Sequence, residues 1–437
     1  MPQLHDRTRR KICIAAFFAV CVLPTCCLFA WGISRHNPWH ASAYAQQLES
    51  YLGLNVTIDH VEHPLPGVIR YHGVRLCDPE TGQVVAVFNR IEARLQKVQD
   101  RPLPALELEA DSAWICPKRF DSFTRLLNRA MARRMTSDDV DLQLDIGELK
   151  LQADGNDTDS GITTLTTVEG RLQTIENGSR AKFSFWLGSP GEDADSTEPI
   201  SIYISRDRRD TPASISFIID ARIAPLPCGL LAMVMPECAS LGSNSRFQGY
   251  ISAQKTVDGW KGDVQDAKLT DIDLESLLGR RFPNTLTGQA QVTIQQARFS
   301  DGRLQEAIGS MAAGPGMVGG EFYNSVWIQL FLDSYIRIPA EVKYAPYDKL
   351  SLNFTINHDS LQIKGAIANQ ARPAILTNTA GPMLVEMEKQ PQPQTISALL
   401  NTLAPVNSYQ IPATAQVQRL SNFLPLPNAS KIIKNTQ

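Results

Sequence analysis

Apolar and polar side chains alternate along most of the chain that follows the N-terminal segment. In "ALELEAD" (105–111), Leu106 and Leu108 fall on one face, and Glu107 and Glu109 fall on the other. The same period of two recurs in "AKFSFWL", "PISIYIS", "ASISFIID", "AQVTIQ" and "LSLNFTIN". This period is typical of strands with one face against apolar surface and one face in water. Turn sequences such as "DPETG" and "ENG" separate the strands, so the pattern predicts a long antiparallel meander.

Two local features modify this pattern. In "DLQLDIGELKLQAD" the apolar phase changes across Gly147, which predicts a β-bulge. Apolar residues at helical spacing predict helices over 117–135, 269–280, 321–335 and 395–403. The first of these carries an arginine at every fourth position from Arg125 to Arg133. It either caps the end of a sheet or lies on an anionic membrane surface.

The N-terminus carries a long apolar segment. Ile12–Ile33 contains no charged side chain, and at about 1.5 Å per residue it reaches across a hydrocarbon core of about 30 Å. Basic residues within 7–11 precede it, which predicts a transmembrane anchor over 12–34 with the N-terminus in the cytoplasm. A cleaved signal peptide whose helix breaks at Pro24 and a lipoprotein signal at Cys26 are the alternatives.

The net charge and the cysteines indicate which partners and which cellular compartment to expect. The 437 residues carry a net charge of −3, which gives no electrostatic argument for nucleic acid as a partner. Four of the eight cysteines lie outside the apolar segment, and an exported, oxidising compartment favours disulfides. We expect Cys228 to pair with Cys238 across a short loop and Cys77 to pair with Cys116. Four buried thiols are the alternative.

Two motifs suggest chemistry. "GPGMVG" (314–319) matches a dinucleotide-binding glycine motif, but that motif works within a βαβ unit, so we interpret it as a turn between strand and helix. His60, Glu62, His63 and His72 suggest a metal site, but strand residues alternate faces and no zinc spacing occurs, so we interpret them as solvent-facing. The sequence contains no nucleophile elbow, P-loop or zinc-protease motif, and we predict no enzyme, cofactor or metal.

The segment after the anchor, "YLGLNVTIDHVEHPLPGVIRYHGVRLCDPETGQVVAVFNRIEARL", resembles the start of the AsmA-like proteins, whose pattern is roughly "LG..V.I..V....PG.....GV.L.DP.TG..V.....I...L". The likeness is carried by Leu52, Gly53, Val56, Ile58, Pro66, Gly67, Gly73, Val74, Leu76, Asp78, Pro79, Gly82, Ile91 and Leu95. "LTGQAQVTIQQARFSDGRLQEAIGSMAAGPGMVG" and "YDKLSLNFTINHDSLQIKGAI" are similar to the C-terminal portion of that family. The middle of the chain shares only the strand pattern.

This resemblance implies a fold and a location. AsmA-like proteins resemble bridge-like lipid transfer proteins, in which an elongated, curled β-sheet lines a groove with apolar side chains. The family is anchored in the inner membrane of diderm bacteria, with its bulk in the periplasm, and is implicated in phospholipid transport toward the outer membrane and in envelope maintenance. We therefore expect a mainly β chain: an N-terminal transmembrane helix, then an elongated, curled antiparallel β-sheet (β-groove) with a few capping α-helices. The expected segments are a cytoplasmic N-terminus (1–11), the anchor (12–34), an N-terminal AsmA-like β-region (35–116), an amphipathic helix (117–135), a middle β-region (136–259), a C-terminal AsmA-like β/α region (260–370), and a linker and tail (371–437).

The alternating strands supply the candidate groove residues. These are Val56, Ile58, Leu106, Leu108, Phe183, Phe185, Ile202, Ile204, Ile215, Phe217, Val292, Ile294, Leu352, Phe354 and Ile356. The expected partners are a phospholipid or another lipid, the membrane and other envelope proteins. The main alternative is a membrane-anchored β-rich scaffold or adhesion-like protein, whose apolar faces close into cores and hold no lipid. An exported enzyme with an unrecognised site is the third reading.

Overall fold

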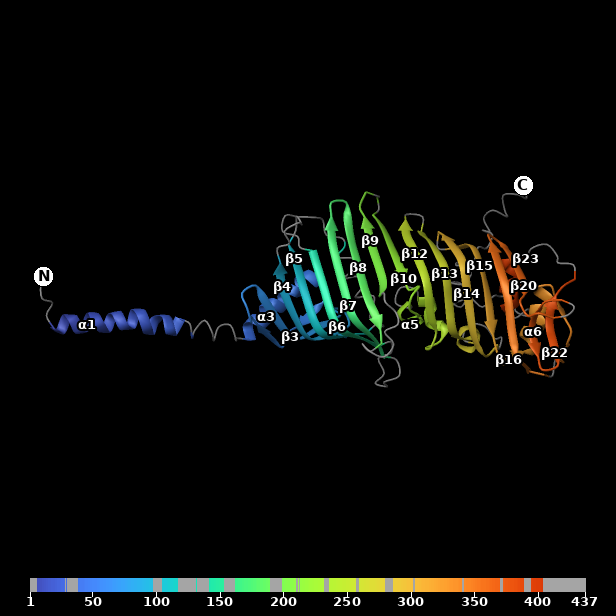
Figure 1. The fold of residues 1–437 in the computed structure, drawn as a ribbon, viewed down its shortest axis with the longest axis horizontal. Coiled ribbons are helices and arrows are strands. Elements are labelled where there is room, and N and C mark those ends of the chain that lie inside the picture. Colours follow the sequence, from blue (N-terminus) through green and yellow to red (C-terminus); the bar gives the residue numbers. More distant parts are fainter. Residues whose placement is uncertain are drawn as a thin grey trace.

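The protein is mainly β in its computed structural model, and one large sheet dominates it (Figure 1). The structure describes residues 6–27, 29, 38–96, 104–116, 131, 141–152, 162–188, 199–209, 211, 213–231, 236–256, 259–279, 286–301, 303–339, 342–369, 372–388 and 394–403. The expected helix over 117–135 lies outside these residues except for Met131, and so does the tail after Leu403.

A helical segment stands at the N-terminus. α1 (Asp6–Phe17) continues into a π-helical turn (Phe18–Val22), and the backbone stays helical to Cys27. Large apolar side chains along this segment are exposed. Within the described residues, no helix is both long and apolar enough to cross a membrane. Positions 28 and 30–34 of the expected anchor lie outside the described residues.

The strands account for most of the remaining structure. They are β1 (Asn55–Thr57), β2 (His60–Glu62), β3 (Val68–Cys77), β4 (Val84–Gln96), β5 (Ala105–Ile115), β6 (Asp141–Gln152), β7 (Ile162–Ile175), β8 (Gly178–Leu187), β9 (Ile200–Asp207), β10 (Ser214–Asp220), β11 (Leu226–Pro227), β12 (Arg246–Thr256), β13 (Gly259–Asp273), β14 (Gln289–Ser300), β15 (Arg303–Ala313), β16 (Gly316–Gly319), β17 (Leu332–Ser334), β18 (Tyr344–Tyr347), β19 (Lys349–Asn357), β20 (Ser360–Gly365), β21 (Ala374–Asn378), β22 (Gly381–Glu386) and β23 (Gln394–Thr395).

Fourteen of these strands lie side by side along the sheet. Their order is β3-β4-β5-β6-β7-β8-β9-β10-β12-β13-β14-β15-β19-β20. Every pair is antiparallel except β5 and β6, which are parallel. This pair corrects the expectation of an uninterrupted antiparallel meander. Residues 116–140 separate the two strands, and a stretch of that length is enough for the crossover that a parallel pair requires.

Shorter strands complete both ends of the sheet. β1 and β2 pair with β3 at the N-terminal end. β21 pairs with β19 and β22, β17 pairs with β22, and β23 pairs with β20 at the C-terminal end. β11 adds to β12, while β16 and β18 form a separate two-stranded ribbon. In the described part of the chain, no second large sheet is present.

Backbone irregularities keep the apolar side chains on one face. In β13, Asp266 and Asp271 have φ of 46° and 55°, a conformation that Asp adopts more readily than most residues. The pairing shifts opposite Asp266 and across Asp271. Because each shift adds a residue, Val264, Leu269 and Ile272 all pack on the buried clusters although their spacing is not strictly even.

The phase change predicted at Gly147 is resolved in the same way. Ile146 and Leu149, on either side of Gly147, both lie in one buried cluster. The register shift itself lies in β7, between Thr166 and Glu169, where Thr167 has φ of 49°. The β-bulge predicted at Gly147 is therefore wrong in its position, because β6 pairs in unbroken register with both β5 and β7 and the extra residue lies in β7, opposite β8.

Helices pack against the sheet in several places. α3 (Pro38–Leu52) lies on β1 and β2, and α5 (Cys228–Leu231) packs beside β11. At the C-terminal end, α6 (Gly320–Gln329) packs on α7 (Ile396–Leu403). The C-terminal cluster that these two helices close includes Leu286, Ala307, Tyr323, Ile356, Leu376, Met383, Leu384 and Ile396.

Three expectations for the C-terminal half change. The helix expected over 269–280 is replaced by the end of β13 and a π-helical turn (Glu275–Gly279). The helix expected over 321–335 ends at Gln329. The expected linker from 371 contains the β21–β22 hairpin, whose apolar residues enter the C-terminal cluster. The helix expected over 395–403 is confirmed as α7.

Candidate functional site

Register pairing places one apolar residue from each of the fourteen strands in a single row. Directly paired residues in neighbouring strands point to the same face of a sheet. The central row consists of Ile69, Ala93, Leu108, Leu144, Gly170, Phe183, Ile202, Ile219, Ile251, Val264, Ala297, Ala307, Ile356 and Leu361. No polar side chain interrupts it.

Two more rows flank the central row on the same face. The outer row is Leu95, Leu106, Leu142, Leu172, Ala181, Ile204, Phe217, Ala253, Gly262, Phe299 and Leu304. The inner row is Leu226, Phe247, Leu269, Val292, Met311, Leu352 and Gly365. We call the three rows together the apolar face.

The apolar face is only partly covered. Its central residues Phe183, Ile202 and Phe217 are half-buried, whereas the C-terminal cluster beneath α6 and α7 is closed. Leu95, at the N-terminal end of the outer row, is 61% exposed. The face is therefore partly open near β4–β13, and at its C-terminal end buried residues such as Ile356 stand beside half-buried ones such as Leu352 and Phe354.

Most of the predicted groove residues meet on this face. The central row takes Leu108, Phe183, Ile202 and Ile356; the outer row takes Leu106, Ile204 and Phe217; the inner row takes Val292 and Leu352. Ile294 and Phe354 both pair with Gly309, in a shorter row that lies between the central row and the inner row. Phe185 pairs with the buried Ile200. Val56 begins another short row with Leu76, Ala86, Ile115 and Leu151. Ile58 lies between β1 and β2, half-buried, and Ile215 lies beside the outer row.

Glycines within the rows were not singled out from the sequence. A methyl group on Gly170 would lie 3.3 Å from the Phe183 ring, and one on Gly309 would lie 2.8 Å from the Phe354 ring. Each glycine thus leaves room for an aromatic ring on the neighbouring strand. The sequence did hold a signal for these positions: each is a glycine inside an alternating strand, and another strand carries an aromatic residue.

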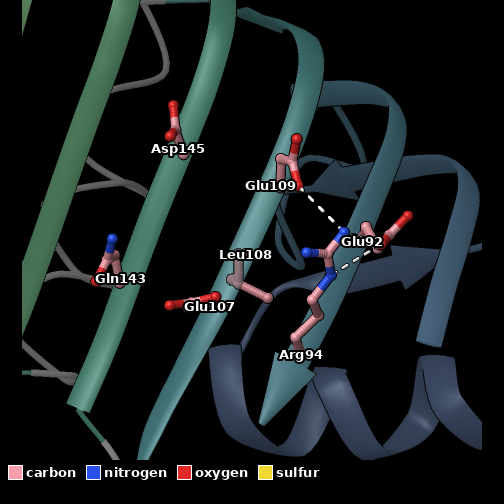
Figure 2. Close-up of a pocket in the computed structure, with 7 residues that line it drawn as sticks. All are labelled: Glu92, Arg94, Glu107, Leu108, Glu109, Gln143 and Asp145. Carbon is pink, nitrogen blue, oxygen red and sulfur yellow. Dashed lines mark hydrogen bonds and ion pairs between the residues drawn. The ribbon is translucent and has the colours of Figure 1, made fainter. Parts of the chain in front are cut away.

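The opposite face of β3–β7 carries charges. A row on this face runs through Arg70, Glu92, Glu109, Asp145 and Glu169. A polar pocket lies here, lined by Glu92, Arg94, Glu107, Glu109, Gln143 and Asp145 together with Leu108, the member of the central row between Glu107 and Glu109 (Figure 2).

Glu92 is the buried member of this charged face. It is 7% exposed and accepts hydrogen bonds from Arg94 Nη2 at 2.5 Å and from Arg70 Nη2 at 2.9 Å. Figure 2 shows Arg94 reaching toward both Glu92 and Glu109. The hydrogen bonds from Arg94 and then Arg70 lower the pKa of Glu92 below its usual value. These two hydrogen-bonded ion pairs compensate the burial of the Glu92 carboxylate.

The histidines lie nearby on the same charged face. His60 Nε2 and His72 Nε2 lie 3.6 Å and 3.4 Å from the Glu62 carboxylate, which also lies 3.5 Å from Arg70. The interaction with His72 is the main cause that lowers the pKa of Glu62. His63 turns the other way and meets Tyr44 of α3. Within the described residues, no group of three or more His, Cys, Asp or Glu side chains is arranged to hold a metal ion.

The expected disulfides are not formed in the structure. Cys77, Cys116, Cys228 and Cys238 are all thiols. Cys77 pairs with Val84 of β4, and the Cys116 backbone bonds to Val85 on the other side of β4. β4 therefore separates these two cysteines by two strand spacings, about 9.6 Å, which exceeds the span of a disulfide. Burial raises the pKa of the Cys228 thiol.

The "GPGMVG" segment forms no dinucleotide site of the βαβ kind. Residues Gly316–Gly319 are β16, which pairs antiparallel with β18 and leads into α6. A phosphate-binding glycine loop requires a parallel βαβ unit. The segment leads into α6 as expected, but residues Gly316–Gly319 form a strand and not the turn that the sequence suggested.

No family model, curated protein or solved structure matches the chain. The resemblance to AsmA-like proteins therefore stays a prediction from the sequence.

Proposed function

We propose that this protein is a membrane-anchored, AsmA-like lipid-binding protein that holds acyl chains on its apolar face. The observation that carries the proposal is the central row, which runs across fourteen strands without a polar side chain. A partly open apolar surface of this extent is costly in water and marks a binding surface. Apolar contact along a row requires no catalytic group, so the proposal does not involve an enzyme.

The length of the row suits lipid tails. Fourteen strands at about 4.8 Å spacing give a row of about 60 Å. A single leaflet provides roughly 15 Å of hydrocarbon, half of a core of about 30 Å. The apolar face is therefore long enough for several acyl chains placed end to end. It is too short to cross a bacterial envelope unaided, so transport requires other envelope proteins or further copies of the chain.

The N-terminal segment supports membrane attachment. Ile14, Phe17, Val20 and Leu23 are exposed on the helical segment that starts at α1. Exposed apolar side chains around a helix are stable in lipid and unfavourable in water. With basic residues before them, they favour an inner-membrane anchor, a cytoplasmic N-terminus and a periplasmic sheet. The proposed role is phospholipid transport or outer-membrane assembly and maintenance of the envelope.

The second candidate is a membrane-anchored scaffold or adhesion-like protein without lipid cargo. The C-terminal cluster favours it, since residues of α6, α7 and the β21–β22 hairpin pack there into one buried core with Ala307 and Ile356 of the apolar face. Extraction and mass spectrometry of lipid from the full chain, purified in mild detergent, separates the two. Phospholipid that stays bound through extensive detergent exchange supports the lipid-binding proposal. Protein that retains none, while still folded, favours the scaffold.

A further inference from the structure

A basic rim borders the apolar face. Next to the outer row, register pairing forms a row of Ser179, Arg206, Ile215, Lys255 and Trp260. This row lies on the apolar face of the sheet, because each member is two residues from a member of the outer row on its own strand. Positive charges thus stand directly beside apolar side chains.

Lys255, Trp260 and Phe217 form a contact group at this rim. The Lys255 ammonium lies 5.9 Å from the centre of the Trp260 ring. The Trp260 ring meets the Phe217 ring edge-on at 5.6 Å between centroids. Trp260 is 40% exposed, so a ligand can reach it. A cation over an aromatic ring beside an apolar row suits a molecule with a charged head and an apolar tail.

Two cations, Arg206 and Lys255, flank Ile215 in this row. Arg206 and Lys255 both pair with Ile215 from opposite sides, so their backbones are about 10 Å apart. The Lys255 ammonium lies over Trp260 at the exposed end of the row, and Arg206 is half-buried beyond Ile215. Arginine and lysine are the side chains that bind phosphate oxygens most readily.

The rim is closed on one side and open on the other. Ser179 Oγ donates a hydrogen bond to the Met131 carbonyl oxygen at 2.9 Å, and Arg208 Nη2 donates to the same oxygen at 3.2 Å. Met131 is buried, so it covers the end of the rim at β8. The accessible end is that of Lys255 and Trp260.

We propose that this rim binds the phosphate of an anionic phospholipid, with Lys255 and Arg206 on the headgroup and the acyl chains across Phe217 and Ile204. The proposal rests on the proposed lipid-binding function and adds the headgroup class to it. Charge complementarity selects this occupant, because a net negative headgroup meets two cations. A zwitterionic headgroup brings its own ammonium against them.

The test uses the full chain in mild detergent with equimolar phosphatidylglycerol and phosphatidylcholine that carry identical acyl chains. Native mass spectrometry measures the ratio of the two lipids retained. We expect the wild-type chain to retain roughly fivefold more phosphatidylglycerol, and Lys255→Gln to bring the ratio close to one. Lys255→Arg keeps the charge and is expected to retain most of the preference.

The matched control is Lys261→Gln. Lys261 is exposed on the same strand as Trp260 and pairs with Gln254, so it points to the opposite face. Its substitution is expected to leave the lipid ratio unchanged. Lipid held at the anchor would respond to neither substitution, so a change in Lys255→Gln alone identifies lipid bound at the rim. Equal retention of both lipids by the wild-type chain, or an unchanged preference in a folded Lys255→Gln chain, overturns the headgroup site alone. Retention of neither lipid overturns the lipid-binding function as well.

Discussion

The ring of Phe354 lies over Gly309, its register partner on the neighbouring strand. A methyl group on Gly309 would lie 2.8 Å from Phe354 Cζ and closer still to the carbonyl oxygen of Thr293. Both contacts are shorter than packed atoms allow, so glycine is the residue that fits here. The aromatic ring fills the place of a side chain, and the row stays apolar across β15.

Gly309→Ala is therefore expected to destabilise the sheet. We expect a loss of about 1–3 kcal/mol in the free energy of unfolding, because the new methyl overpacks the row and presses on backbone. Chemical denaturation followed by circular dichroism measures it. The control is Gly229→Ala in α5, where nothing lies within 4 Å of the added methyl and the change is expected within about 0.5 kcal/mol. Equal effects of the two substitutions would contradict the packing of Phe354.

Glu92 makes the sheet sensitive to acid. Its pKa is lowered in the folded protein, chiefly by Arg94 and then by Arg70. A lowered folded pKa gives stability that is present above the unfolded value, near 4.5, and is lost as the pH falls through the folded value. Glu92→Gln is expected to cost about 1–2 kcal/mol at pH 7 and to reduce the decline in stability below pH 4.5.

The control for this substitution is Glu109→Gln. Glu109 lies in the same pocket and its side chain is 62% exposed, 3.6 Å from Arg94. Exposed ion pairs contribute little to stability, so the pH profile of this variant is expected to follow that of the wild-type chain. Denaturation at several pH values compares the three proteins. A Glu92→Gln profile that also matches the wild type would refute the assigned role of Glu92.

Substitutions of Asp266 test whether the register shift in β13 depends on the left-handed backbone conformation of this residue. Its φ of 46° is tolerated by Asp, Asn and Gly but is unfavourable for β-branched residues. Asp266→Val is expected to cost about 1–3 kcal/mol in unfolding free energy, whereas Asp266→Asn is expected to stay within about 0.5 kcal/mol. Thermal or chemical denaturation distinguishes them. Full stability of the valine variant would show that the backbone does not need the left-handed conformation.

The sequence predicted the local features of the fold well. Alternation identified strands such as β5 and β9, whereas the β-bulge expected at Gly147 of β6 lies instead in the neighbouring strand β7. These features depend on neighbouring residues only, so they can be read from a short window. The same alternation placed Leu108, Phe183 and Ile202 on one face, which the register confirms.

Features that depend on strand order were not predictable. The parallel β5–β6 pair depends on where the long connection returns the chain. The pairing of Cys77 with Cys116 was wrong because β4 lies between them, which sequence spacing does not reveal. The basic rim was also missed, since Arg206 and Lys255 are far apart in the sequence and come into one row only because both pair with Ile215.

Photo-crosslinking at Phe217 tests the central claim most directly. A benzophenone side chain replaces Phe217 in the outer row or, as the control, Tyr203 in β9. Tyr203 is aromatic and 40% exposed, but it pairs with Lys182 and Ile218 on the opposite face. After irradiation of cells that produce the full chain, mass spectrometry of the purified protein detects lipid adducts.

Acyl-chain adducts at position 217, and none above background at 203, are the result that the lipid-binding proposal predicts. The greater exposure of Tyr203 makes this a demanding comparison, because a reaction governed by access alone would favour the control. A folded protein without lipid adducts at 217, or with equal adducts at both positions, would contradict the proposal that the apolar face carries lipid.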